Sequence, residues 1–102
     1  MTPAVLILGY LKKQQAIAEA DLKLFEYRSD LHGRKRMSEA QGESLAYSFL
    51  ARELADVEQP EVMLALVHNA MQVAPEGDSI TRAAYIKACS DIVAMLLSYR
   101  SI

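Results

Sequence analysis

The stretch Leu31–Glu43, LHGRKRMSEAQGE, determines where a first helix ends and a second one begins. Gly33 is placed to adopt the left-handed conformation with which many helices end. Ser38 and Gln41 have the spacing of a capping box, the side-chain pattern that begins a helix. The basic run Arg34-Lys35-Arg36 lies between these two signals. We therefore predict a corner between two helices, with the three cations near the negative end of the first helix dipole.

The composition predicts a helical protein with one core. The chain has 102 residues, and we expect a single helical domain over residues 1–102. Apolar residues make up 52% and charged residues 24%, which is typical of globular chains and not of disordered ones. Good helix formers dominate, and no strand-like alternation is present. The predicted fold class is all-α, a bundle of about four helices with a long N-terminal helix.

The first helix should be unusually long for a chain of this size. Thr2 and Pro3 have N-cap and first-turn character, and Asp78 or Ser79 caps the last helix. A first helix of about 30 residues would be about 45 Å long. That exceeds what a compact domain of this size needs, so dimerisation along the exposed part is one way to cover it. The expected helices are residues 3–32, 38–56, 60–73 and 79–99.

The first helix carries apolar residues in two adjoining stripes. Because the combined face is wider than a coiled-coil seam, we expect this helix to pack against more than one neighbour. Short loops between the four helices predict antiparallel neighbours. The two stripes are Ile17, Ala20, Leu24, Tyr27 and Leu31, and beside them Ala18, Leu22 and Phe25.

Charge is distributed unevenly along the chain. Residues 1–37 hold seven basic and four acidic side chains, whereas residues 38–78 hold one basic and eight acidic side chains. Such blocks are usually solvated surfaces. The alternative is a surface that steers a charged partner, either another protein or a second copy. The acidic face predicted on the second and third helices consists of Glu39, Glu43, Glu53, Asp56, Glu58 and Glu61.

No pattern typical of catalysis or metal binding is present. His32 and His68 belong to no HExxH or CxxC type of site, and the chain has neither a GxSxG elbow nor a glycine-rich phosphate loop. Cys89 is the one cysteine, which excludes an intramolecular disulfide, and its apolar neighbours predict a buried thiol in a reducing compartment. We therefore expect no enzymatic activity, no cofactor and no metal.

The apolar run Ala4–Leu11 needs a separate argument. Its eight residues fall short of the roughly 20 that a spanning helix requires. Its lysines follow the run, whereas a signal peptide has them in front. We expect a cytoplasmic protein whose first turns are buried, with no membrane association.

By elimination we expect a small protein-interaction module: an adaptor, inhibitor or regulatory subunit. It would form a homodimer or a helical cap on a partner protein. The acidic face would set orientation and association rate, and methionines would adapt to the partner's surface. The candidate partner-binding residues are Glu53, Asp56, Glu58, Glu61, Tyr10 and Leu11, with Met37, Met63 and Met71 as adaptable contacts.

Two alternatives use the charged groups differently. A dimeric regulator could present basic corners to nucleic acid through Arg28, Arg34, Lys35 and Arg36. We prefer the structural interpretation of this corner, because the chain has a formal charge of −2 and no aromatic platform beside these cations. Nucleic acid is therefore not an expected partner. In the second alternative, an acidic surface of Glu53, Glu58 and Glu61 mimics nucleic acid and inhibits an enzyme that binds it.

Overall fold

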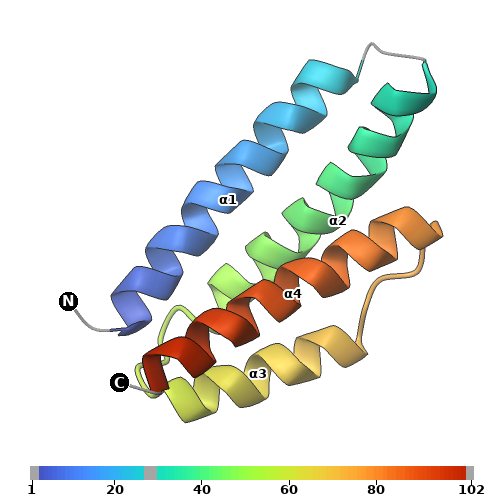
Figure 1. Cartoon of the computed structure of the whole chain (residues 1–102). Helices are drawn as coiled ribbons and strands as arrows, with labels where there is room; N and C mark the ends of the chain where they lie inside the picture. The colour runs from blue at the N-terminus through green and yellow to red at the C-terminus, as the bar shows by residue number, and fades with distance from the viewer. Residues whose placement is uncertain (1–2, 27–29, 101–102) are drawn as a thin grey trace.

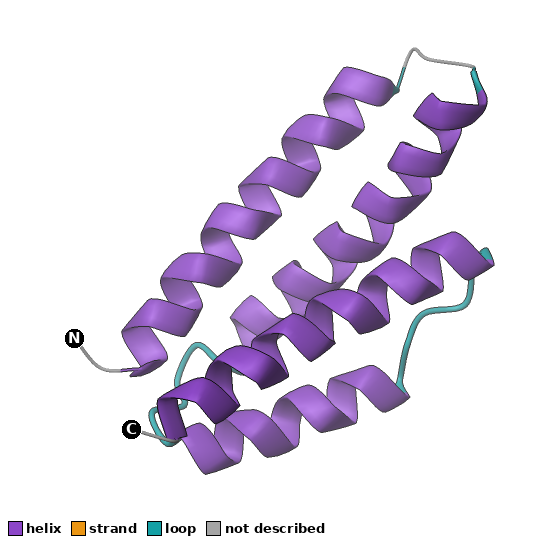
Figure 2. Cartoon of the chain, in the orientation of Figure 1, coloured by secondary structure: helices purple, strands orange, loops and turns teal. Residues whose placement is uncertain are grey.

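The described part of the chain folds into four helices, which loops connect (Figure 2). The computed structural model describes the backbone of residues 3–26 and 30–100, and the side chains of residues 4–26 and 30–99. The helices are α1 (Pro3–Phe25), α2 (Leu31–Glu53), α3 (Pro60–Gln72) and α4 (Ser79–Arg100). The all-α class is confirmed, and α3 and α4 begin where the sequence predicted. The predicted N-cap at Thr2 lies outside the described residues.

The boundary between the first two helices was predicted wrongly. α1 ends at Phe25, and α2 begins at Leu31, directly after Asp30, whose backbone is extended with φ −70° and ψ 161°. Aspartate is a favoured residue at the start of a helix, so Asp30 is the signal that was missed. Gly33 is no helix stop: it lies inside α2, and no residue in the described part of the chain has a positive φ. The basic run therefore occupies the first two turns of α2 and forms no corner.

Folding back before Leu31 lets α1 and α2 cover each other. Gly33, Ala40 and Tyr47 are seven residues apart along α2, and all three are buried. This side of α2 faces α1, because the rings of Tyr47 and Tyr10 meet edge to face with their centroids 6.4 Å apart. The small residues allow the two backbones to approach closely. A single helix over residues 3–32 would have left the same surfaces exposed to water.

α2 and α4 form the central pair of the bundle. α1 packs mainly on α2, and α3 packs on α4, whereas α1 and α4 make few contacts and so do α2 and α3 (Figure 1). The prediction that short loops join packed neighbours is therefore right for α1–α2 and α3–α4 but wrong for α2–α3. α2 also ends at Glu53, three residues earlier than predicted.

The core lies toward the end of the molecule where α1 starts and α4 finishes. Leu11 and Met63 are fully buried in it, so the prediction that they contact a partner is wrong. Cys89 is buried as predicted. The first helix was expected to pack against more than one neighbour, but it packs mainly on α2, and Ile17 of its first stripe is 44% exposed. The largest fully buried side chains are Ile7, Leu11, Leu50, Leu54, Met63, Ile92, Leu96, Val67 and Cys89.

The backbones of the central pair come into close contact at Gly42. A methyl group added there would overlap the carbonyl oxygen of Thr81 and would lie 3.0 Å from the Cβ of Ala84. The hydroxyl of Thr81 also donates to the carbonyl oxygen of Ser38 at 3.1 Å. Glycine is therefore required in the middle of α2, where its low helix propensity would otherwise be unfavourable.

We predict that Gly42→Ala destabilises the fold by about 1–3 kcal/mol, because the added methyl group forces α2 and α4 apart. Gly9→Ala is the matched control, since a methyl group there meets no atom within 4 Å. It should stabilise the fold by up to about 1 kcal/mol through helix propensity alone. Urea unfolding of both variants measures the difference, and a stabilising Gly42→Ala would contradict the packing described above.

Candidate functional site

A groove of about 480 Å³ runs between α2 and α4. Four of its lining residues stand four apart on one side of α2, and the others come from the first four turns of α4. The walls of the groove carry charges of both signs. The lining residues are Lys35, Glu39, Glu43, Tyr47, Ser79, Ile80, Ala83, Ala84, Lys87, Ala88 and Asp91.

The packing of the helices explains why this groove exists. Gly42 allows α2 and α4 to come into close contact beside the groove. α4 diverges from α1 toward the Phe25 end of α1 (Figure 1), and the residues that line the groove come from α2 and α4. Three of the seven α4 lining residues are alanines, Ala83, Ala84 and Ala88, whose side chains are single methyl groups. The space that larger side chains would have filled is therefore open.

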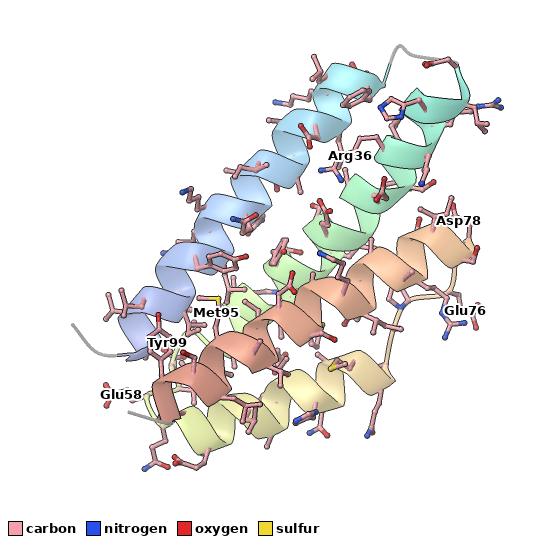
Figure 3. All side chains as sticks on the ribbon, in the orientation of Figure 1. Arg36, Glu58, Glu76, Asp78, Met95 and Tyr99 are labelled. Atoms are coloured by element: carbon pink, nitrogen blue, oxygen red, sulfur yellow. The ribbon has the colours of Figure 1, made fainter. Side chains whose placement is uncertain are left out.

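Arg36 binds two carboxylates, those of Asp21 and Glu43, beside this groove. Its guanidinium donates to Asp21 Oδ2 on α1 at 3.1 Å through Nε and at 2.5 Å through Nη2. It also donates to both carboxylate oxygens of Glu43, each at 3.1 Å. Hydrogen bonds to Glu43, and then those to Asp21, raise the pKa of Arg36 above its ordinary value. Figure 3 shows Arg36 between α1 and α2, where it holds the two helices together.

Replacing Arg36 with Met should lower the free energy of unfolding by about 1–2 kcal/mol, because Asp21 and Glu43 lose their shared cation. The effect is smaller than for a fully buried pair, since about a quarter of each of the three side chains is exposed. Lys35→Met is the control, and it should change stability by less than about 0.5 kcal/mol. Equal effects in urea unfolding would show that Arg36 does not hold α1 to α2.

A second polar cluster fixes the start of α4 against α2. Asp78 Oδ1 accepts a hydrogen bond from the backbone N–H of Thr81 at 2.7 Å, which is the N-cap geometry predicted for this residue. Asp78 Oδ2 accepts from the hydroxyl of Ser38 at 3.1 Å. The bond from the Thr81 N–H is the main reason why the pKa of Asp78 lies below its ordinary value. Ser38 therefore secures α4, although it was predicted to cap α2.

We expect Asp78→Ala to lower the melting temperature at pH 7. A carboxylate with a lowered pKa stabilises the folded state above its ordinary pKa of about 3.9, and this contribution is lost as the pH falls through the folded-state value. The difference between wild type and Asp78→Ala should therefore disappear in acid. Glu76→Ala, which removes an exposed carboxylate from the same turn, is the control. A pH-independent difference would rule out this role for Asp78.

The groove offers fixed charges and hydrogen-bond donors. Lys87 and Asp91 form an ion pair of 3.6 Å along its α4 rim, and Lys35 and Glu39 have the same spacing on α2. Burial raises the pKa of Tyr47, so its phenol remains neutral near pH 7 and acts as a donor or acceptor but not as a phenolate base. This lining suits a ligand that has a narrow apolar face flanked by charges.

A smaller cavity of about 200 Å³ lies on the other side of the central pair. Tyr85 forms part of its wall, and the Tyr85 hydroxyl donates to the carbonyl oxygen of Ala70 at 3.0 Å, which connects α4 to α3. Arg52 is the cation of this lining. The groove and the smaller cavity thus lie on opposite sides of the α2–α4 contact. The remaining lining residues of the smaller one are Leu45, Ser48, Phe49, Val73 and Pro75.

The predicted acidic face consists of two separate groups. Glu53, Asp56, Glu58 and Glu61 are all exposed, and they surround the connection from α2 to α3 at one end of the molecule, where Figure 3 labels Glu58. Glu39 and Glu43 belong to the groove instead. Glu43 is occupied by Arg36, so it contributes little unpaired charge.

The other candidates are dispersed along α1, α2 and α3. Tyr10 is half-buried against Tyr47. Arg34 and Lys35 are exposed, but Arg36 is held by its two carboxylates, so the basic run presents two cations to solvent and not three. Arg28 lies outside the described residues. Met37 and Met71 are half-buried.

Sequence reasoning missed the groove, although signals for it were present. Arg36 and Glu43 are seven residues apart, a spacing at which side chains share one side of a helix. That spacing became meaningful only once α2 was known to start at Leu31. The alanines at positions 83, 84 and 88 were a second signal, since small residues on one helix face leave room for a neighbour. Asp21 could not have been assigned to Arg36, because it comes from another helix.

Comparison of the chain with protein-family models, curated proteins and solved structures gives no match. Within residues 3–26 and 30–100, no helix is long and apolar enough to span a bilayer. The same part of the chain contains no cluster of three or more His, Cys, Asp or Glu side chains that could hold a metal ion. The functional argument therefore rests on the geometry of the groove and of the exposed helix faces.

Proposed function

We propose that this protein is a non-enzymatic interaction module that binds a helical segment of a partner protein in the groove between α2 and α4. The observation that carries the proposal is the lining of the groove, which lies between two helices and includes Ala83, Ala84 and Ala88 on its α4 wall. A helix laid along such a groove can insert its larger apolar side chains beside Ala83, Ala84 and Ala88 of the α4 wall. The bound helix would complete the open side of the bundle.

The charges along the rims specify the chemistry of the partner. Lys35 and Glu39 on α2, and Lys87 and Asp91 on α4, each place a cation and an anion one helical turn apart. A partner helix with charged residues of both signs beside its apolar face can pair with both rims. Such pairs favour one orientation and register over others more than they add affinity.

The acidic end of the molecule has a separate role in this proposal. Glu53, Asp56, Glu58 and Glu61 are exposed and close together in the chain. Their field attracts a basic region of the partner during encounter and accelerates association at low ionic strength. The association rate of the partner should therefore fall as salt is added, while its dissociation rate changes little.

Ala83→Arg tests the groove directly, because it places a long charged side chain at an exposed position of the α4 wall. Ala65→Arg introduces the same side chain at an exposed position of α3, away from the groove, and serves as the control. The partner recovered from source cells with the wild-type chain should bind Ala83→Arg at least about tenfold more weakly, a difference of about 1.4 kcal/mol. It should bind Ala65→Arg as well as wild type.

Two results would contradict the proposal. In the first, the partner binds Ala83→Arg and Ala65→Arg with equal affinity, which would place its site elsewhere on the molecule. In the second, every protein that the wild-type chain recovers is also recovered by the Ala83→Arg variant. Circular dichroism and urea unfolding of both variants establish that neither result comes from loss of the fold.

A further inference from the structure

The second half of α1 carries apolar side chains that its own chain leaves uncovered. Ile17 and Leu24 are seven residues apart and therefore lie on the same side of α1. Tyr10, seven residues before Ile17, lies half-buried at the edge of this face, with its ring against Tyr47. Ile17 is 44% exposed and Leu24 is 68% exposed. Figure 1 shows the reason: α4 diverges from α1 toward Phe25, so this half of α1 has α2 as its neighbour. The groove described above is lined by α2 and α4, so this helix face is a separate surface.

Charged residues on this face are placed symmetrically about Ile17. Lys13 precedes Ile17 by four residues, and Asp21 follows it by four. Lys13 is exposed, and Asp21 is half-buried, using Oδ2 to bind Arg36. In both directions from Ile17 the face therefore has a charged residue at the fourth position and an apolar residue at the seventh. The two charges have opposite signs.

We infer that a second copy of this chain covers the face, with the two α1 helices antiparallel and Ile17 on the twofold axis. In this arrangement Tyr10 of one copy meets Leu24 of the other, and Lys13 of one copy meets Asp21 of the other. Each pairing occurs twice, as a twofold interface requires. A parallel arrangement would bring Lys13 against Lys13 and Asp21 against Asp21. The charge pattern thus favours a second copy of this chain as the partner of the face, with its α1 antiparallel to the first.

The interface is one face of one helix, so it belongs to the small and weak class of protein contacts. Covalent trapping is therefore a better probe than native mass alone. Ile17→Cys places a thiol of each copy at the twofold axis, where two such residues can come within disulfide distance. The natural Cys89 does not interfere, because it is buried and burial raises the pKa of its thiol to about 11. Wild-type protein is the control for that residue.

Mild oxidation with diamide should convert Ile17→Cys to a covalent dimer several times faster than Ala16→Cys. Ala16 is exposed as well, but one residue along a helix turns by about 100°, so it lies off the paired face. Adding Lys13→Glu to the Ile17→Cys chain should slow the cross-linking severalfold, because it brings a carboxylate against Asp21 of the second copy. Lys12→Glu, the exposed neighbour, should leave the rate unchanged.

Two results would overturn the inference. Cross-linking of Ile17→Cys no faster than that of Ala16→Cys would mean that no copy meets this face. Equal rates for the Lys13→Glu and Lys12→Glu chains would mean that the face meets a copy without the charge pairing that sets its direction. Because Ala83 lies on α4 and Ile17 on α1, failure here leaves the proposed partner groove untouched, and failure of the groove leaves this interface untouched.

Discussion

The close approach of α2 and α4 at Gly42 is the constraint on which the rest of the structure depends. No side chain separates the two helices at this point, and the hydroxyl of Thr81 bonds to the backbone of α2 at Ser38. Asp78 holds the first turn of α4 in the same place. Once this central pair is fixed, α1 packs on the α2 side and α3 on the α4 side. The bundle is consequently open, because the two outer helices do not close it.

Openness of this kind provides surfaces that a closed four-helix bundle lacks. A closed bundle covers the apolar stripes of all four helices with one another. Here the α2–α4 pair has a groove on one side and a smaller cavity on the other, and the second half of α1 exposes Ile17 and Leu24. Large exposed apolar side chains grouped on one face are typical of interaction surfaces. The proposals of a partner groove and a twofold α1 contact both follow from this one property of the fold.

Much of the architecture could be predicted from local patterns. Proline and acidic residues mark the start of α3, Asp78 marks the start of α4, and the spacing of Tyr85, Cys89, Ile92 and Leu96 marks the buried face of α4. The predictions made from these features are right because each depends on residues within one or two turns. The predicted boundary between α1 and α2 was wrong because it depends on contacts between helices. Gly33 and Ser38 have strong local preferences as a helix stop and a helix cap, but packing against α1 and α4 overrides both.

The candidate site was harder to predict because it depends on which helices become neighbours. Gly42 looks like a weak point in α2 until Thr81 is known to lie against it. Arg36 looks like part of a basic patch until Asp21, fifteen residues away, is placed beside it. Tyr10 and Leu11 are adjacent in sequence, yet one is half-buried at the edge of the bundle and the other is fully buried in the core. Distinctions of this kind require the arrangement of the helices.

Amide hydrogen exchange of the dilute, monomeric chain tests the central claim most directly, because it reports the local stability of each helix separately. The slowest amides should be those of α2 and α4 around their contact, within residues 42–50 and 85–92. The second half of α1, residues 18–25, should exchange much faster, since it has a single neighbouring helix. Equal protection along α1 and the central pair would contradict an open bundle built on α2 and α4.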